Sequence, residues 1–193
     1  MKKTLIGLVS GLLLSTVAMA SPYSDLVQMR ATFFKATSWR IEEHIADHGT
    51  LVVEYSAPDR WRFEPSSHLQ EVIIGKDVYM VTNGHAMKLP ASYGNVIAKR
   101  MASKSKSDPL AGASKADLKK TARDLGMHKL HGKSVHVYKF TVRGIPETLY
   151  VGADRLPVRA IMKGVLIHGK HIDVIADFSR FNQPIAIKKP HTS

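Results

Sequence analysis

Three histidine pairs in the sequence have spacings at which two imidazole rings can share a divalent metal ion. The pairs are His44 with His48, His128 with His131, and His168 with His171. Imidazole is a common ligand of zinc and of related metals. The first pair would need a helix to bring its rings together, but the surrounding residues are typical of a strand and a turn. The other pairs bracket turns without a carboxylate pattern, so we predict no metal ligands, and metal binding by surface histidines remains the alternative.

Known catalytic motifs are absent from the sequence. It contains no Gly-x-Ser-x-Gly elbow, no His-Glu-x-x-His, no phosphate-binding loop, no dinucleotide fingerprint and no cysteine. Glu42 and Glu43 are adjacent, and neighbours on a strand point to opposite faces, so they cannot act on one bond. We therefore predict no catalytic residues, no cofactor and no enzyme activity. A hydrolase assembled from scattered Ser, His and Asp residues is a further hypothesis, because triads are defined by geometry.

The N-terminus has the three parts of a secretory signal. Lys2 and Lys3 precede an apolar run from Leu5 to Val17, which ends in Ala18-Met19-Ala20. The run is shorter than the roughly 20 residues that cross a bilayer, so we expect cleavage after Ala20 and a periplasmic location. Residues 21–193 then form a single domain, with no later stretch long enough to span a membrane. Without cysteine the chain has no site for the acyl anchor of a lipoprotein.

The formal net charge of +12 predicts attraction to anions. Nucleic acid is the usual partner of a basic protein, but export argues against it. Anionic headgroups of lipids or an acidic partner protein fit an exported chain better. A solvated basic surface that keeps the protein soluble is the alternative interpretation.

The pattern of the first half predicts one helix followed by antiparallel strands. Ser21 is a suitable cap for a helix over 22–35, in which Leu26, Met29 and Phe33 share a face. Strands are expected at 39–45, 51–55, 61–64, 71–74 and 77–82, with turns at His48-Gly49 and Asn83-Gly84.

The second half predicts helices and then a meander of strands. A helical pattern over 93–124 is interrupted by the polar segment 103–109, for which we expect a mobile loop. A better helix is expected over 115–125, ended by Gly126. Strands follow at 136–142, 147–151, 157–162 and 171–178, with a final edge segment at 183–188.

Four segments of the chain have a recognisable order and spacing: Tyr55–Arg62 (YSAPDRWR), the hairpin from Val72 to Pro90, Leu149–Arg159 (LYVGADRLPVR) and Asp177–Ile185 (DFSRFNQPI). Together they resemble the periplasmic lipoprotein carriers of the LolA type and the LolA-like and mycobacterial LppX/LprG-like lipid carriers. The resemblance covers most of the mature chain and contains no catalytic fingerprint. It implies an α+β, mainly β fold: a strongly curved antiparallel sheet of about 11 strands that forms an unclosed half-barrel, with helices covering its concave face.

The function that this resemblance implies is a soluble carrier or binding protein for a lipid, or for the acyl chains of a lipoprotein, held in an apolar cavity. A membrane-anchored donor or acceptor protein would be a partner, and a monomer is expected. A non-catalytic sensor is the alternative on the same fold. Alternating apolar positions give the cavity candidates Phe33, Leu51, Val53, Tyr55, Trp61, Phe63, Val78, Met80, Tyr138 and Phe140. Arg60 and Arg62 are the candidates for contact with an anionic headgroup.

Overall fold

The computed structural model describes residues 21–101 and 107–192. The predicted signal at residues 1–20 lies outside the described residues. Within the described part, no helix is both long and apolar enough to cross a membrane. The elements are, in chain order, α1 (Pro22–Lys35), β1 (Ser38–Ile45), β2 (Gly49–Ser56), β3 (Arg60–Ser66), β4 (Leu69–Ile74), β5 (Asp77–Thr82), β6 (His85–Lys88), α2 (Ala91–Met101), α3 (Lys115–Thr121), β7 (Arg123–Leu130), β8 (Lys133–Val142), β9 (Ile145–Val151), β10 (Pro157–Ile167) and β11 (Lys170–Ser179).

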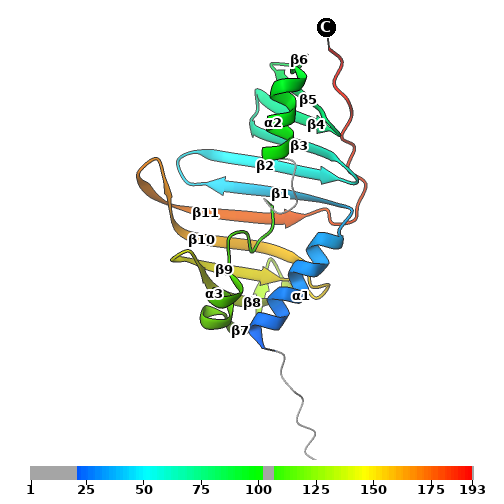
Figure 1. Cartoon of the computed structure of the whole chain (residues 1–193). Coiled ribbons are helices and arrows are strands. Elements are labelled where there is room, and N and C mark those ends of the chain that lie inside the picture. The colour runs from blue at the N-terminus through cyan, green and yellow to red at the C-terminus, as the bar shows by residue number, and fades with distance from the viewer. Residues whose placement is uncertain (1–20, 102–106, 193) are drawn as a thin grey trace, which may run out of the picture.

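All eleven strands belong to one antiparallel sheet, in the order β6-β5-β4-β3-β2-β1-β11-β10-β9-β8-β7. Two meanders therefore meet where the first and last strands pair, with Ile41 opposite Phe178. The outermost strands β6 and β7 do not pair with each other, so the sheet is an unclosed half-barrel (Figure 1). The three helices lie on its concave side (Figure 1). The predicted α+β half-barrel is thus confirmed.

Helix α1 begins where its local sequence predicts. The Ser21 hydroxyl accepts a hydrogen bond from the Ser24 backbone N–H at 3.2 Å, and Pro22 occupies the first turn. The apolar face formed by Leu26, Met29 and Phe33 is buried against the sheet. This helix therefore covers part of the concave face and forms one wall of the pocket described below.

Strand alternation separates a concave apolar face from a convex polar one. On β3, Trp61 and Phe63 are buried in the main core, while Arg60 and Arg62 point to the other side. The Trp39 ring lies 5.7 Å from that of Phe33 and 5.5 Å from those of Tyr55 and Trp61, measured between centroids. The chain's own aromatic rings thus fill the concave face beneath the C-terminal half of α1.

The C-terminal segment differs from the predicted edge strand. Residues 183–188 form no regular strand, and Ile185 and Ile187 are buried against Val72 and Tyr79. Val72 and Tyr79 alternate with Ile73 and Val78 of the main core, so they face the convex side. The prediction was wrong because the two isoleucines cover this apolar patch instead of joining the sheet edge.

The predicted helix over 115–125 was wrong at its C-terminal end. Helix α3 ends at Thr121, and β7 begins at Arg123. Gly126 has a φ of +82° at a register shift between β7 and β8, and Leu125 is exposed rather than on a buried helix face. The helical spacing of Leu118, Ala122 and Leu125 misled the prediction, because pairing with β8 decides this segment.

The polar interruption after α2 is partly packed. Residues 102–106 lie outside the described residues, but Asp108, Pro109 and Leu110 are buried, and Leu110 joins the main core. The expectation of a mobile loop over 103–109 therefore does not hold for its last two residues. Their turn lies over the concave face and covers a second cavity there.

Candidate ligand pockets on the concave face

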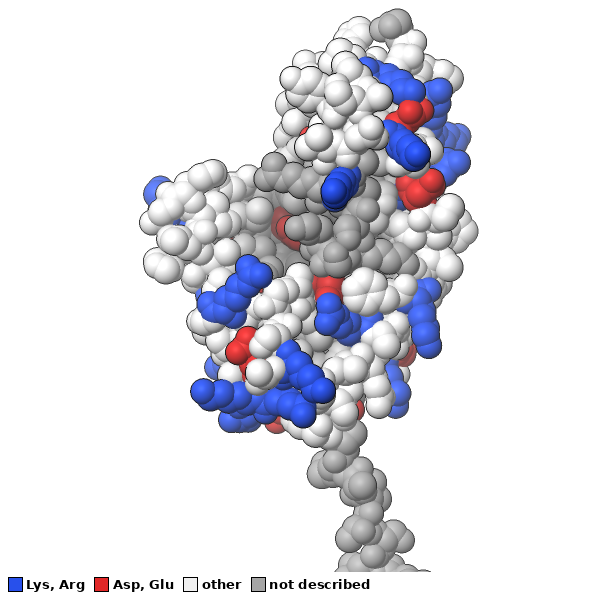
Figure 2. Space-filling view, in the orientation of Figure 1, with Lys and Arg blue, Asp and Glu red and all other residues white. Residues whose placement is uncertain are grey.

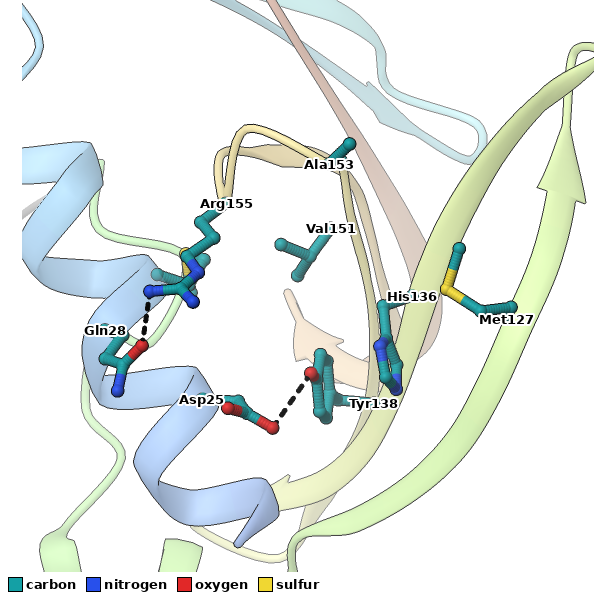
Figure 3. A pocket seen from close by; sticks show the side chains of 10 residues that line it. Asp25, Gln28, Met127, His136, Tyr138, Val151, Ala153 and Arg155 are labelled. Atoms are coloured by element: carbon teal, nitrogen blue, oxygen red, sulfur yellow. Dashed lines mark hydrogen bonds between the residues drawn. The ribbon is translucent and has the colours of Figure 1, made fainter. Parts of the chain in front are cut away.

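A pocket of about 340 Å³ lies between the N-terminal half of α1 and strands β7 to β9 (Figure 3). Its apolar wall includes Met29, Met127 and Val151. Met29 and Val151 are buried, whereas 63% of Met127 is exposed, so the pocket opens to solvent beside β7. A flexible thioether at such an opening adapts readily to the shape of an apolar ligand.

Two hydrogen bonds join α1 to the opposite side of this pocket. The Tyr138 hydroxyl donates to Asp25 at 3.2 Å, and Arg155 donates to the Gln28 side-chain oxygen at 2.6 Å (Figure 3). Burial, together with the negative charge of Asp25, raises the pKa of Tyr138 well above its ordinary value. Tyr138 therefore stays protonated and keeps donating, which holds α1 at a fixed distance from β8.

His136 forms the floor beside Tyr138. The two rings stack with centroids 4.7 Å apart, and the His136 Nε2 atom lies 2.5 Å from Asp124. Partial burial would raise the pKa of Asp124, but the Gly126 N–H and His136 outweigh burial and hold that pKa below its ordinary value. The β7 bulge at Gly126 thus holds Asp124 against His136, which lines the pocket.

A larger pocket of about 700 Å³ lies at the rim next to the first. Both pockets are lined by Gly152 and Ala153 of the β9–β10 loop. Its apolar contacts include Leu156, Phe178 and Phe181. The volumes of both pockets lie within the range of small-molecule sites, roughly 300–1,000 Å³. Two adjacent open pockets with apolar walls and a few polar groups suit a ligand that has both apolar and polar parts.

The predicted cavity residues share the concave face, and most of them are core. Eight are buried in the main cluster, and Leu51 packs against it while partly exposed. Met80 lies two residues from the buried Val78 on β5 and is half-buried. Tyr138 also lines the pocket beside α1. Which of these side chains contact a ligand stays a prediction. The buried eight are Phe33, Val53, Tyr55, Trp61, Phe63, Val78, Tyr138 and Phe140.

The two predicted headgroup contacts have partners on the convex face. Arg60 donates to the Ile187 carbonyl at 2.8 Å, and Arg62 pairs with the fully buried Glu54. Side-chain alternation with Trp61 and Phe63 directs both guanidinium groups away from the concave face. A headgroup held on the concave face would not meet them, and whether either arginine contacts a ligand stays a prediction.

Several pocket residues were not predicted from the sequence. Asp25, Gln28 and Met29 lie on α1, Met127 on β7, and Arg155 on a loop. These residues share no sequence pattern, and only the tertiary structure brings them together. Arg155 lies within the segment Leu149–Arg159 that carries the family resemblance, which is the one signal that pointed to this loop.

The histidines are arranged differently from the sequence pairs. The His48 and His168 rings lie 5.9 Å apart on neighbouring turns, and His44 Nδ1 lies 2.9 Å from the Thr50 hydroxyl. Among residues 21–101 and 107–192, no group of three or more His, Asp or Glu side chains is placed to hold a metal ion. The pairing of His48 with His168 depends on the β1–β11 contact and is invisible in the sequence.

Comparison with solved structures supports the fold. No family model and no curated protein matches the sequence. The lipoprotein LppX of Mycobacterium tuberculosis superposes with a TM-score of 0.60 at 12% identity, over 86% of this chain and 98% of LppX. LprF of Mycobacterium bovis gives a TM-score of 0.58 at 11% identity, over 88% of this chain and 96% of LprF. The resemblance to LppX-like proteins is thus confirmed at the level of fold: this chain has the half-barrel fold of LppX and LprF.

Proposed function

We propose that this protein is a periplasmic binding or carrier protein that holds an amphipathic ligand, a lipid or the acyl chains of a lipoprotein, on the concave face of its sheet. The observation that carries the proposal is the pair of adjoining pockets at the rim of the half-barrel. They have apolar walls and share Gly152 and Ala153, and the first of them opens to solvent beside Met127.

The driving force for such binding is burial of the ligand's hydrocarbon. Each methylene group removed from water contributes about 0.8 kcal/mol, so an acyl chain needs contact over several groups to overcome the cost of association. The polar edge of the pocket, formed by Asp25, Gln28 and Arg155, orients the ligand. These groups are hydrogen-bonded to one another or to Tyr138 within the protein. Replacing such a bond by one to a polar group of the ligand costs little net free energy. Binding alone, without a chemical step, accounts for this arrangement.

Filling the rim pockets tests the proposal. Ala153 is exposed and lines both pockets, so Ala153→Trp adds bulk to them without disturbing the core. We expect the affinity for dodecanol, measured by displacement of the fluorescent dye phenylnaphthylamine, to fall by about tenfold or more, equivalent to about 1.4 kcal/mol. Ala46→Trp, at an exposed position between β1 and β2, is the matched control and should bind as the wild type does.

Two results would contradict the proposal. In the first, the wild-type protein takes up neither the dye nor dodecanol. In the second, Ala153→Trp and Ala46→Trp bind dodecanol equally well, which would place binding away from the rim pockets.

A further inference from the structure

A smaller cavity of about 140 Å³ lies on the concave face beneath the turn at 107–111. Its floor combines Ile41 and Met162 with the alanines Ala160 and Ala176, which face each other across β10 and β11. Phe178 lines both this cavity and the rim pocket, so the two spaces adjoin. The small alanine side chains leave this space, the inner cavity, between the sheet and the turn, over the middle strands β1, β11, β10 and β9.

Three residues with carboxyl groups line this inner cavity: Asp108 of the turn above it, and two glutamates on opposite sides of its floor. Glu43 comes from β1, and Glu147 comes from β9. Strands β11 and β10 lie between β1 and β9, a separation of about 14 Å on a flat sheet. Concave curvature brings inward-pointing side chains closer together, so a group in the cavity lies in the field of both glutamates.

Neither glutamate has a partner in the described part of the chain. Glu147 is 8% exposed and makes no hydrogen bond or ion pair with residues 21–101 or 107–192, and the same holds for Glu43. A buried carboxyl group without a partner costs free energy, so its presence requires another role. Desolvation raises the pKa of Glu147 to about 7 and raises the pKa of Glu43 above its ordinary value. A bound positive charge would reverse both shifts.

Of the two cations of α1, Lys35 is exposed and Arg30 already has an acidic partner. Arg30 of α1 pairs with Asp108 at 2.7 Å, and the Leu110 backbone N–H also donates to Asp108. Asp108 thus has partners, although burial still raises its pKa, whereas Glu43 and Glu147 have none among the described residues. In Figure 2, acidic atoms lie at the central hollow of this face, and Lys and Arg side chains lie both at its edge and over the outer parts. Among the described residues that line the inner cavity, the charged side chains are those of Glu43, Asp108 and Glu147.

We propose that the inner cavity is a subsite for a positively charged amine group of the ligand, held by Glu147 and Glu43, while the ligand's hydrocarbon extends through the adjoining rim pockets. This inference rests on the proposed binding function and specifies its ligand class as cationic amphiphiles. It also replaces the anionic headgroup expected from the basic composition, because the arginines assigned to that role face the convex side.

Three probes with the same twelve-carbon chain test the charge preference: dodecylammonium, dodecanol and dodecanoate. Each displaces phenylnaphthylamine from the full mature protein at constant ionic strength, below its micelle concentration. We expect dodecylammonium to bind at least tenfold more tightly than dodecanol, and dodecanoate to bind most weakly. In the Glu43→Gln, Glu147→Gln double variant, this preference should disappear while dodecanol still binds.

Glu71→Gln is the matched control. Glu71 also points to the concave face, since it lies two residues from the core residue Ile73 on β4. Burial raises the pKa of Glu71 as well. This residue does not line the inner cavity. This variant should keep the wild-type preference for the amine. Far-UV and near-UV circular dichroism verify that the variants fold, and loss of a buried charge should not weaken them.

The outcomes separate this inference from the proposed function. Equal binding of the three probes, or a preference that survives in the double variant, would overturn the amine subsite and leave the binding function standing. If Glu71→Gln also loses the preference for the amine, that preference arises from the electrostatic field of the whole concave face, and the subsite is overturned. If none of the probes displaces the dye, the proposed function fails and the subsite fails with it.

Discussion

Glu147 illustrates what single side chains contribute to this molecule. It occupies the third position of β9, where Leu149 and Val151 on the same face are core residues. A carboxyl group at that position interrupts an otherwise apolar alternation, and this was the sequence signal available for the inner cavity. The signal was missed because a lone glutamate on a strand is usually assigned to the solvent face, and only the register of β9 shows otherwise.

The raised pKa of Glu147 predicts a pH-dependent stability. Because burial disfavours the charged form, the folded state binds a proton that the unfolded state has already released between about pH 4.5 and pH 7. The contribution of protonated Glu147 to the free energy of unfolding is fully present below the ordinary pKa of a glutamate, and it is lost as the pH rises through about 7. A shift of this size corresponds to on the order of 3 kcal/mol. Glu147→Gln should therefore gain stability over the wild type at pH 8 but not at pH 4.5.

Urea unfolding of both proteins at pH 4.5 and pH 8 measures this difference. Glu43, Glu71 and Asp108 also have raised pKa values and give both proteins a common slope. Only the difference between the two proteins reports Glu147. Thr148→Ala, the next residue on β9 with its side chain on the opposite face, is the uncharged control. A wild type and a Glu147→Gln variant that respond identically to pH would refute the desolvated carboxyl group.

Among the elements, those with local signals were predicted well. Ser21, Pro22 and the spacing of Leu26, Met29 and Phe33 fix α1 from within its own sequence. The Asn83-Gly84 turn likewise joins β5 to β6, and both residues have positive φ angles. Strand β7 was mistaken for helix because its conformation depends on β8, which lies beyond the reach of a local pattern.

The C-terminal segment acts as a cover for the convex face, and its removal should be costly. Ile187 is 2% exposed, and its carbonyl accepts the hydrogen bond from Arg60. Ile187→Ala keeps that backbone bond and deletes apolar contact with Val72 and Tyr79, so we expect a loss of about 2–4 kcal/mol. The measurement is the urea midpoint at constant m-value. Lys188→Ala, at the exposed neighbouring position, is the control, and an equal effect in both variants would mean that the segment does not pack here.

At the scale of the whole molecule, the sequence predicted the unclosed half-barrel but not its pockets. Strand alternation and the family resemblance are sufficient for a curved sheet with one apolar face, and the order of eleven strands agrees. The pocket beside α1 draws residues from α1, β7, β8 and the loop after β9, so its lining is a property of the tertiary structure. Most of the aromatic residues predicted to line the cavity are buried in the core, where α1 brings Phe33 onto Trp39, and which of them contact a ligand stays a prediction.

The central claim is that the concave face holds a ligand, and native mass spectrometry of the mature protein tests it most directly. The protein would be purified without detergent from the cells that produce it, and its mass compared with that of the denatured chain. We expect a bound species that leaves on denaturation and contains a hydrocarbon chain and an amine. Bare protein that also fails to gain mass from added dodecylammonium would show that the concave face holds no such ligand.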